Sequence, residues 1–306
     1  MDRAPNTSAD RPPETPRIML AIIIAMIAVG SIAFRVLVSH HLEQTSALFV
    51  GVPTLMALIV TFTPRARSLM GIALKGVTLA LLMSGILLGE GFICILMAAP
   101  LFYAITLLVV WSIQYARRRM KARYPKAMYS LIALPLLPLS MEGVDQRLSF
   151  PRDEAVVASK VVPLDPATVE LYLGETPRFD LPLPAYLRLG FPTPGSVQGA
   201  GLQLGDRRVV HFAGGEGRPG DLILEVRERG EGLVRFAMIS DASHIAHWLS
   251  WKESNVQWEP AAGGTRVTWT LRYQRRLDPA WYFGPWERYA VGLSAEYLID
   301  SHLSPK

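Results

Sequence analysis

The sequence predicts two fold classes in one chain: an all-α transmembrane bundle of four to five helices, then an α+β domain with a curved antiparallel sheet around a long C-terminal helix. Three observations predict this division. Long apolar runs fill the first half of the 306 residues, apolar and polar positions alternate as in strands through much of the second half, and a helical period returns at the end.

Four apolar runs in the first half approach the length of membrane-spanning helices. They cover residues 18–38, 47–62, 69–88 and 92–113. A helix needs about 20 apolar residues to cross about 30 Å of hydrocarbon, so each run is predicted to span a membrane. Residues 1–17 carry four prolines and mixed charges without an apolar period, which predicts a disordered tail.

Cationic residues predict the orientation of these spans. Arginines precede the first run, Arg65 and Arg67 separate the second run from the third, and six cationic residues follow the fourth. The intervening loops contain no Lys or Arg. Under the positive-inside rule, the N-terminal tail then lies in the cytoplasm, and we expect a multi-pass protein of the cell (inner) membrane.

A fifth apolar stretch decides on which side of the membrane the second half lies. Its apolar core, residues 128–141, is short enough for a buried or re-entrant segment, whereas residues 127–144 are long enough for a short span. We favour the span, which places the C-terminal domain outside the cytoplasm, in a periplasmic or other extracytoplasmic space. The re-entrant segment is the alternative.

Charge separates the two halves and argues against nucleic-acid binding. Residues 1–144 contain 13 Lys and Arg against 6 Asp and Glu, whereas the remainder contains 18 against 20. The second half therefore has no basic field for phosphates, and no nucleic-acid partner is expected. Cys94 is the single cysteine, so the chain contains no internal disulfide.

After a linker at residues 145–154, the pattern is that of strands and two helices. A β-branched run at 155–162 precedes Asp165 and Pro166, which are typical of the N-cap and first position of a helix. Further strands are expected at 207–213, 221–229, 233–240, 248–259 and 265–277. From Pro279 to about His302 a helical stripe is expected from Trp286, Tyr289, Ala290, Leu293 and Tyr297.

Three segments of the second half carry a family resemblance: residues 156–169, residues 199–208, and the Leu277-Asp278-Pro279 entry into the last helix. Through them, residues 155–303 resemble the SRPBCC superfamily, which includes the START and polyketide-cyclase-like helix-grip domains. The resemblance implies an elongated apolar cavity between sheet and last helix that binds lipids, sterols or other hydrophobic ligands. It implies no shared catalytic residues. Residues 89–100 resemble a bacterial multi-spanning membrane domain with the same fused arrangement.

The first functional hypothesis is a membrane-anchored binding protein for a hydrophobic ligand such as a lipid. Side chains on the apolar face of the predicted sheet and last helix are the cavity candidates, although packing in a solid core is the default interpretation for any one of them. They are Leu224, Val226, Phe236, Met238, Trp269, Leu271, Tyr273, Trp286 and Tyr289. No catalytic residue, metal site or cofactor is predicted, and an enzymatic activity is left open.

The second hypothesis is a membrane enzyme or a redox or metal component. On the predicted topology, His40, His41, Glu43, Glu90 and Cys94 share the outer interface, and such residue types bind transition metals or relay protons. Their spacing matches no metal motif, so solvated loop residues are the simpler interpretation. The bilayer is an expected partner under either hypothesis. Gly85 and Gly89 would allow close helix packing, either within one chain or in a homo-oligomer.

Overall fold

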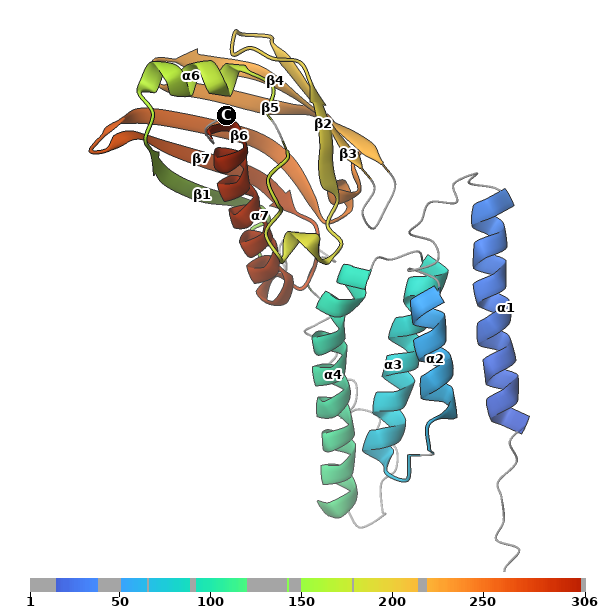
Figure 1. The fold of residues 1–306 in the computed structure, drawn as a ribbon. Helices are drawn as coiled ribbons and strands as arrows, with labels where there is room; N and C mark the ends of the chain where they lie inside the picture. Colours follow the sequence, from blue (N-terminus) through green and yellow to red (C-terminus); the bar gives the residue numbers. More distant parts are fainter. Residues whose placement is uncertain are drawn as a thin grey trace, which may run out of the picture. The chain divides into compact units, whose positions relative to one another are not determined.

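A computed structural model describes residues 15–37, 51–64, 66–88, 92–119, 142, 150–177, 179–213 and 219–303. The chain divides into two compact units, Met1–Trp111 and Ser112–Lys306, and each is described by itself. The N-terminal unit is helical, and the C-terminal unit is built on one sheet (Figure 1). Residues 1–14 of the tail predicted at 1–17 lie outside the described residues, whereas its last three residues form the start of a helix. Residues 47–50 of the second run and nearly all of the fifth apolar stretch also lie outside the described residues.

The helical unit consists of α1 (Thr15–Leu37), α2 (Val52–Phe62), α3 (Leu69–Leu88) and most of α4 (Phe92–Arg119). Among described residues, three helices are long and apolar enough to cross a membrane, through the segments Pro16–Ala33, Leu69–Leu87 and Ile93–Tyr115. The second predicted span is only 11 residues long as a helix, with Pro53 at its start.

Small and branched side chains join the first three helices. Ile24 of α1 packs with Ala57 of α2 and Leu82 of α3, and the Ser31 hydroxyl donates a hydrogen bond to the Ile86 carbonyl at 3.1 Å. Few apolar side chains on these helices are fully buried, and most are partly or fully exposed.

The C-terminal unit contains a seven-stranded antiparallel sheet in the order β1-β7-β6-β5-β4-β3-β2. Its strands are β1 (Asp153–Val162), β2 (Thr193–Gln198), β3 (Arg207–Ala213), β4 (Gly220–Gly230), β5 (Leu233–Asp241), β6 (Leu249–Ala261) and β7 (Gly264–Arg275). Register shifts interrupt the pairing of β2 with β3, β4 with β5, and β6 with β7. Such bulges bend strands, and the sheet curls around the last helix (Figure 1).

Besides the end of α4, the described residues of this unit form the helices α6 (Pro166–Gly174) and α7 (Ala280–Leu303) and the short 3₁₀ turns η3 (Leu187–Leu189) and η4 (His244–His247). The predicted N-cap is confirmed, because the Asp165 carboxylate accepts hydrogen bonds from the amides of Ala167 and Thr168, both at 3.0 Å. The predicted alternation in β7 is also confirmed, with Val267, Trp269, Leu271 and Tyr273 all buried.

Two sequence predictions about this unit were wrong. No strand was predicted at β2, because the prolines between residues 177 and 194 favour an irregular connection between α6 and the following strands. Proline is nevertheless tolerated at the sheet edge that β2 occupies. The stripe predicted on the last helix was also misplaced. Ala290 and Tyr297 are buried, but Trp286 and Tyr289 are 38% and 55% exposed, and Val291, Ala295 and Ile299 are buried instead.

Candidate functional site

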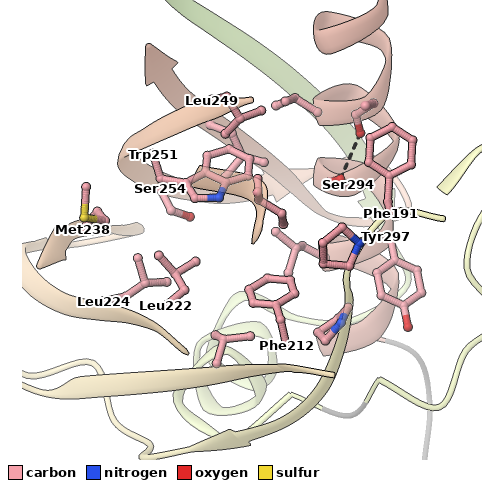
Figure 2. A pocket seen from close by; sticks show the side chains of 18 of the residues that line it. Phe191, Phe212, Leu222, Leu224, Met238, Leu249, Trp251, Ser254, Ser294 and Tyr297 are labelled. Atoms are coloured by element: carbon pink, nitrogen blue, oxygen red, sulfur yellow. Dashed lines mark hydrogen bonds between the residues drawn. The ribbon is translucent and has the colours of Figure 1, made fainter. Parts of the chain in front are cut away.

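A cavity of about 180 Å³ lies in the C-terminal unit between the sheet and α7 (Figure 2). Its lining draws on β2 to β7, on η4, on α7, and on residues 179–192 between α6 and β2, which we call the Pro-rich segment. The lining residues are Phe179, Leu183, Leu187, Phe191, Pro192, Pro194, Arg208, Val210, Phe212, Leu222, Leu224, Phe236, Met238, Ile245, Trp248, Leu249, Trp251, Glu253, Ser254, Trp269, Leu271, Ala290, Val291, Ser294, Tyr297, Leu298 and His302.

The strand period places most of the apolar wall. Alternate residues of a strand point to the same face, so Leu222 and Leu224 of β4 and Met238 of β5 all reach the cavity. Figure 2 shows these three side chains on one side of the view, with Ser294 and Tyr297 of α7 on the other.

Small residues of α7 leave the space open. The small residues Ala290 and Ser294 lie four residues apart on the face of the helix that lines the cavity, and Leu298 follows on the same face. The Ser294 hydroxyl bonds to the Ala290 carbonyl at 2.9 Å and needs no partner across the cavity. Larger side chains at these positions would project towards the sheet and reduce the volume.

The Pro-rich segment closes another side of the cavity and was missed as a source of lining residues. It contributes Phe179, Leu183, Leu187 and Phe191, which recur every four residues, but Pro182 and Pro184 are incompatible with the interior of a continuous helix, and of these four residues Leu187 lies in the short η3 turn. The signal available in the sequence was the high apolar content of this connection, since a solvated loop has little reason to carry so many large side chains.

Tyr186 fixes this segment against α7. Its ring centroid lies 5.3 Å from that of Phe191, 5.1 Å from that of Tyr289 and 6.4 Å from that of Trp286. Burial raises the pKa of Tyr186 to about 12, so its hydroxyl is neutral at physiological pH. Trp286 and Tyr289 thus pack against the Pro-rich segment that closes one side of the cavity, and they do not line its interior.

Most polar groups in the lining already have partners within the protein. The indole N–H of Trp269 donates to the Ser254 hydroxyl at 2.8 Å, and the Tyr297 hydroxyl donates to the Leu181 carbonyl at 3.0 Å. Glu253 pairs with Arg235 at 3.3 Å. The cavity therefore presents a largely apolar surface to a guest.

Arg208 and His302 form a polar end to the cavity. Nδ1 of His302 lies 2.8 Å from the Leu298 carbonyl oxygen, so this nitrogen carries the proton and Nε2 is left to accept from Arg208 at 3.4 Å. Burial, reinforced by the charge of Arg208, lowers the pKa of His302 to about 3. Burial also lowers the pKa of Arg208, to about 10, and leaves it charged at neutral pH.

Five of the nine cavity candidates predicted from the sequence line the cavity: Leu224, Phe236, Met238, Trp269 and Leu271. The other four do not. Val226 and Tyr273 are 1% exposed and belong to the solid part of the core, while Trp286 and Tyr289 lie on the partly exposed flank of α7. The alternation along a strand predicts which face of the sheet a side chain occupies. It does not predict which side chains on that face line the cavity and which pack in the solid core.

The alternative cluster is largely outside the described residues, which include only Cys94 among its five members. Cys94 lies half-buried at the start of α4. Within the described part of the chain, no group of three or more His, Cys, Asp or Glu side chains is arranged to hold a metal ion. The metal or redox hypothesis stays a prediction. Gly85 is described and buried in α3, but Gly89 is not described.

Solved structures resemble the C-terminal half at low identity. A START superfamily protein from Mycobacterium smegmatis is 13% identical over 48% of this chain and 92% of its own, with a TM-score of 0.35. A protein from Thermus thermophilus is 20% identical over 49% of this chain and 92% of its own, with a TM-score of 0.33. A protein from Chromobacterium violaceum is 12% identical over 50% and 98%, with a TM-score of 0.30.

No family model and no curated protein sequence matches the chain. The helix-grip arrangement of the C-terminal half rests on its own sheet order and on the position of α7 against the curled sheet.

Proposed function

We propose that this chain is a membrane-anchored binding protein for a hydrophobic ligand, such as a lipid, which occupies the cavity of the C-terminal unit. The observation that carries the proposal is an apolar cavity of about 180 Å³, left open by small residues of α7. An engineered apolar cavity of about 150 Å³ in another protein binds benzene. Transfer of an apolar guest out of water is favourable in proportion to the area it buries.

The helical unit supports the membrane part of the proposal. Three of its helices have the length and hydropathy of membrane spans, and few of their apolar side chains are fully buried within the unit. We propose that these helices anchor the chain in the cell membrane, with the N-terminal tail in the cytoplasm and the C-terminal unit on the opposite side. An anchor of this kind would keep the cavity near a source of lipid and raise the effective concentration of the ligand.

Filling the cavity tests the function. Ser294→Phe places a large ring in the cavity from the α7 side. We expect it to reduce ligand occupancy at least tenfold, because the ring fills space that the ligand would occupy. The measurement is native mass spectrometry of the full chain in mild detergent, with lipid analysis of the molecules that remain bound.

Glu296→Phe is the matched control, because Glu296 is an exposed residue of the same helix and outside the lining. We expect this variant to retain the ligand. Equal occupancy in the wild type and both variants would contradict the proposal, as would a wild-type protein that carries no hydrophobic ligand and takes up none from mixed lipids.

A further inference from the structure

We propose that the cavity selects amphiphiles with an anionic head, a carboxylate or a phosphate, and that the Arg208 guanidinium binds this head. The inference rests on the proposed function, because it requires that a hydrophobic ligand enters the cavity, and it specifies the class of that ligand.

Arg208 is a buried cation that no described carboxylate contacts, although the charge of Asp206 acts on it from beyond ion-pair distance. It is 5% exposed, and within the described residues it takes part in no ion pair with a carboxylate. The buried Arg275, in contrast, pairs with Asp278 at 2.7 Å, and the partly buried Arg229 pairs with Glu170. Burying a charge that no opposite charge contacts is costly. An anionic ligand that reached Arg208 would therefore bind favourably, because it would form the ion pair that no described carboxylate forms.

The contacts that Arg208 does make are with neutral acceptors. Its guanidinium donates to the carbonyl of Leu173 and lies 3.4 Å from both the Gly201 carbonyl and Nε2 of His302. It also lies over the ring of Phe236, with 4.8 Å from Cζ to the ring centroid. Leu173 and His302 are in the last turns of α6 and α7, where a helix offers only about half a negative charge.

The unmatched hydrogen-bonding atoms of the lining are both donors. Among described lining residues, the buried side-chain atoms with no hydrogen-bond partner are Nε of Arg208 and Nε1 of Trp251. An unsatisfied buried donor costs about 1–3 kcal/mol. A guest with oxygen acceptors would relieve this cost, whereas a pure hydrocarbon would not.

The cavity has a polar end and an apolar remainder, which suits an elongated amphiphile. Along α7 the lining extends from Ala290 to His302, which are twelve residues and therefore about 18 Å apart. Arg208 lies at the His302 end. A head bound there would leave the tail to run along α7 towards Ala290, over side chains that are mainly apolar.

The test compares two ligands of equal length, dodecanoate and dodecanol. The full chain is placed in phosphatidylcholine nanodiscs at neutral pH, and equilibrium binding of each radiolabelled ligand is measured against empty nanodiscs. We expect the wild type to bind dodecanoate at least tenfold more tightly than dodecanol, because a hydrogen bond to a charged group is worth more than a tenfold change in affinity. Arg208→Gln should abolish this preference and leave dodecanol binding within about twofold, whereas Arg208→Lys should retain part of it.

Arg229→Gln is the control, because Arg229 also bonds to a backbone carbonyl near α6 but has its own acid and does not line the cavity. Its ligand preference should equal that of the wild type. Equal wild-type affinity for the two ligands would overturn the inference and leave the proposed function standing. A preference that survives in Arg208→Gln would also overturn it, and failure of both ligands to bind would overturn the proposed function as well. The wild-type comparison stands even where Arg208→Gln does not fold.

Discussion

At the scale of single residues, His302 shows how burial fixes a protonation state. It is 8% exposed, and its ring centroid lies 5.0 Å from that of Trp269. The Arg208 guanidinium lies 3.4 Å from its Nε2. A proton on Nε2 would place a second positive charge against the guanidinium in the interior, so the folded protein holds the imidazole neutral. The unfolded chain has no such restriction.

His302 therefore makes stability fall in mild acid. Its pKa is about 3 in the folded protein and about 6.5 when unfolded, so between these values the unfolded chain binds more protons and stability declines as pH falls. We expect this residue to remove about 2 kcal/mol of the free energy of unfolding between pH 7 and pH 5. Urea denaturation at both pH values, followed by tryptophan fluorescence, measures the loss.

His302→Asn is the comparison, because its amide can still donate to the Leu298 carbonyl but does not titrate. The variant should lose less stability than the wild type over the same pH range. If both proteins lose the same free energy, His302 is charged in the folded state or accessible to water.

At the scale of elements, the start of α7 is held by a residue from a distant part of the chain. Both carboxylate oxygens of Glu142 lie 3.0 Å from the Ala280 amide, and one lies 3.6 Å from the guanidinium of Arg275, whose side chain is fully buried. The first amides of a helix have no partner within the helix, and a carboxylate there also interacts favourably with the helix dipole.

Removing this carboxylate should loosen the first turn of α7. We expect Glu142→Ala to reduce the free energy of unfolding by about 2 kcal/mol, because it leaves the Ala280 amide unbonded and leaves Arg275 with Asp278 as its ion-pair partner among the described residues. Glu142→Gln should cost less, since its amide oxygen still accepts from Ala280. Hydrogen exchange of the amides of residues 280–283 should be faster in the Ala variant and unchanged in Glu296→Ala.

At the scale of the whole molecule, two units of different surface chemistry share one chain. The helical unit exposes apolar side chains, and its described residues contain no Asp or Glu, whereas the sheet unit has many ion pairs at its surface, such as Lys160 with Asp300 and Arg207 with Glu225 at 2.7 Å. The first surface suits hydrocarbon and the second suits water.

The proposed membrane topology can be tested with single cysteines. Cys94 is the only cysteine, so Cys94→Ser gives a cysteine-free background. Leu204→Cys adds a thiol at a residue that is 69% exposed in the sheet unit. We expect a membrane-impermeant maleimide to label it in intact spheroplasts, whereas Ser8→Cys in the N-terminal tail should react only after lysis. Labelling of Leu204→Cys only after lysis would place the sheet unit in the cytoplasm.

Much of the fold could be predicted because strand periodicity and helix capping depend on residues that are close together in the sequence. Residues 207–213 were predicted as a strand and form one with the same bounds, and Asp165 caps α6 as its sequence context indicated. The edge strand β2 was missed, because its prolines obey a rule that depends on its place in the sheet. About half of the candidate cavity residues line the cavity, since the face of a strand follows from its period.

The sequence by itself determined the division into apolar helices and a sheet unit, because hydropathy and period depend only on which residues follow one another. Tertiary structure alone decided that Ala290 and Ser294 leave a cavity, that Phe179 and Phe191 help to enclose it, and that Arg208 is buried at one end of it. These facts depend on contacts between segments far apart in the chain, where packing rather than local pattern decides which space is filled.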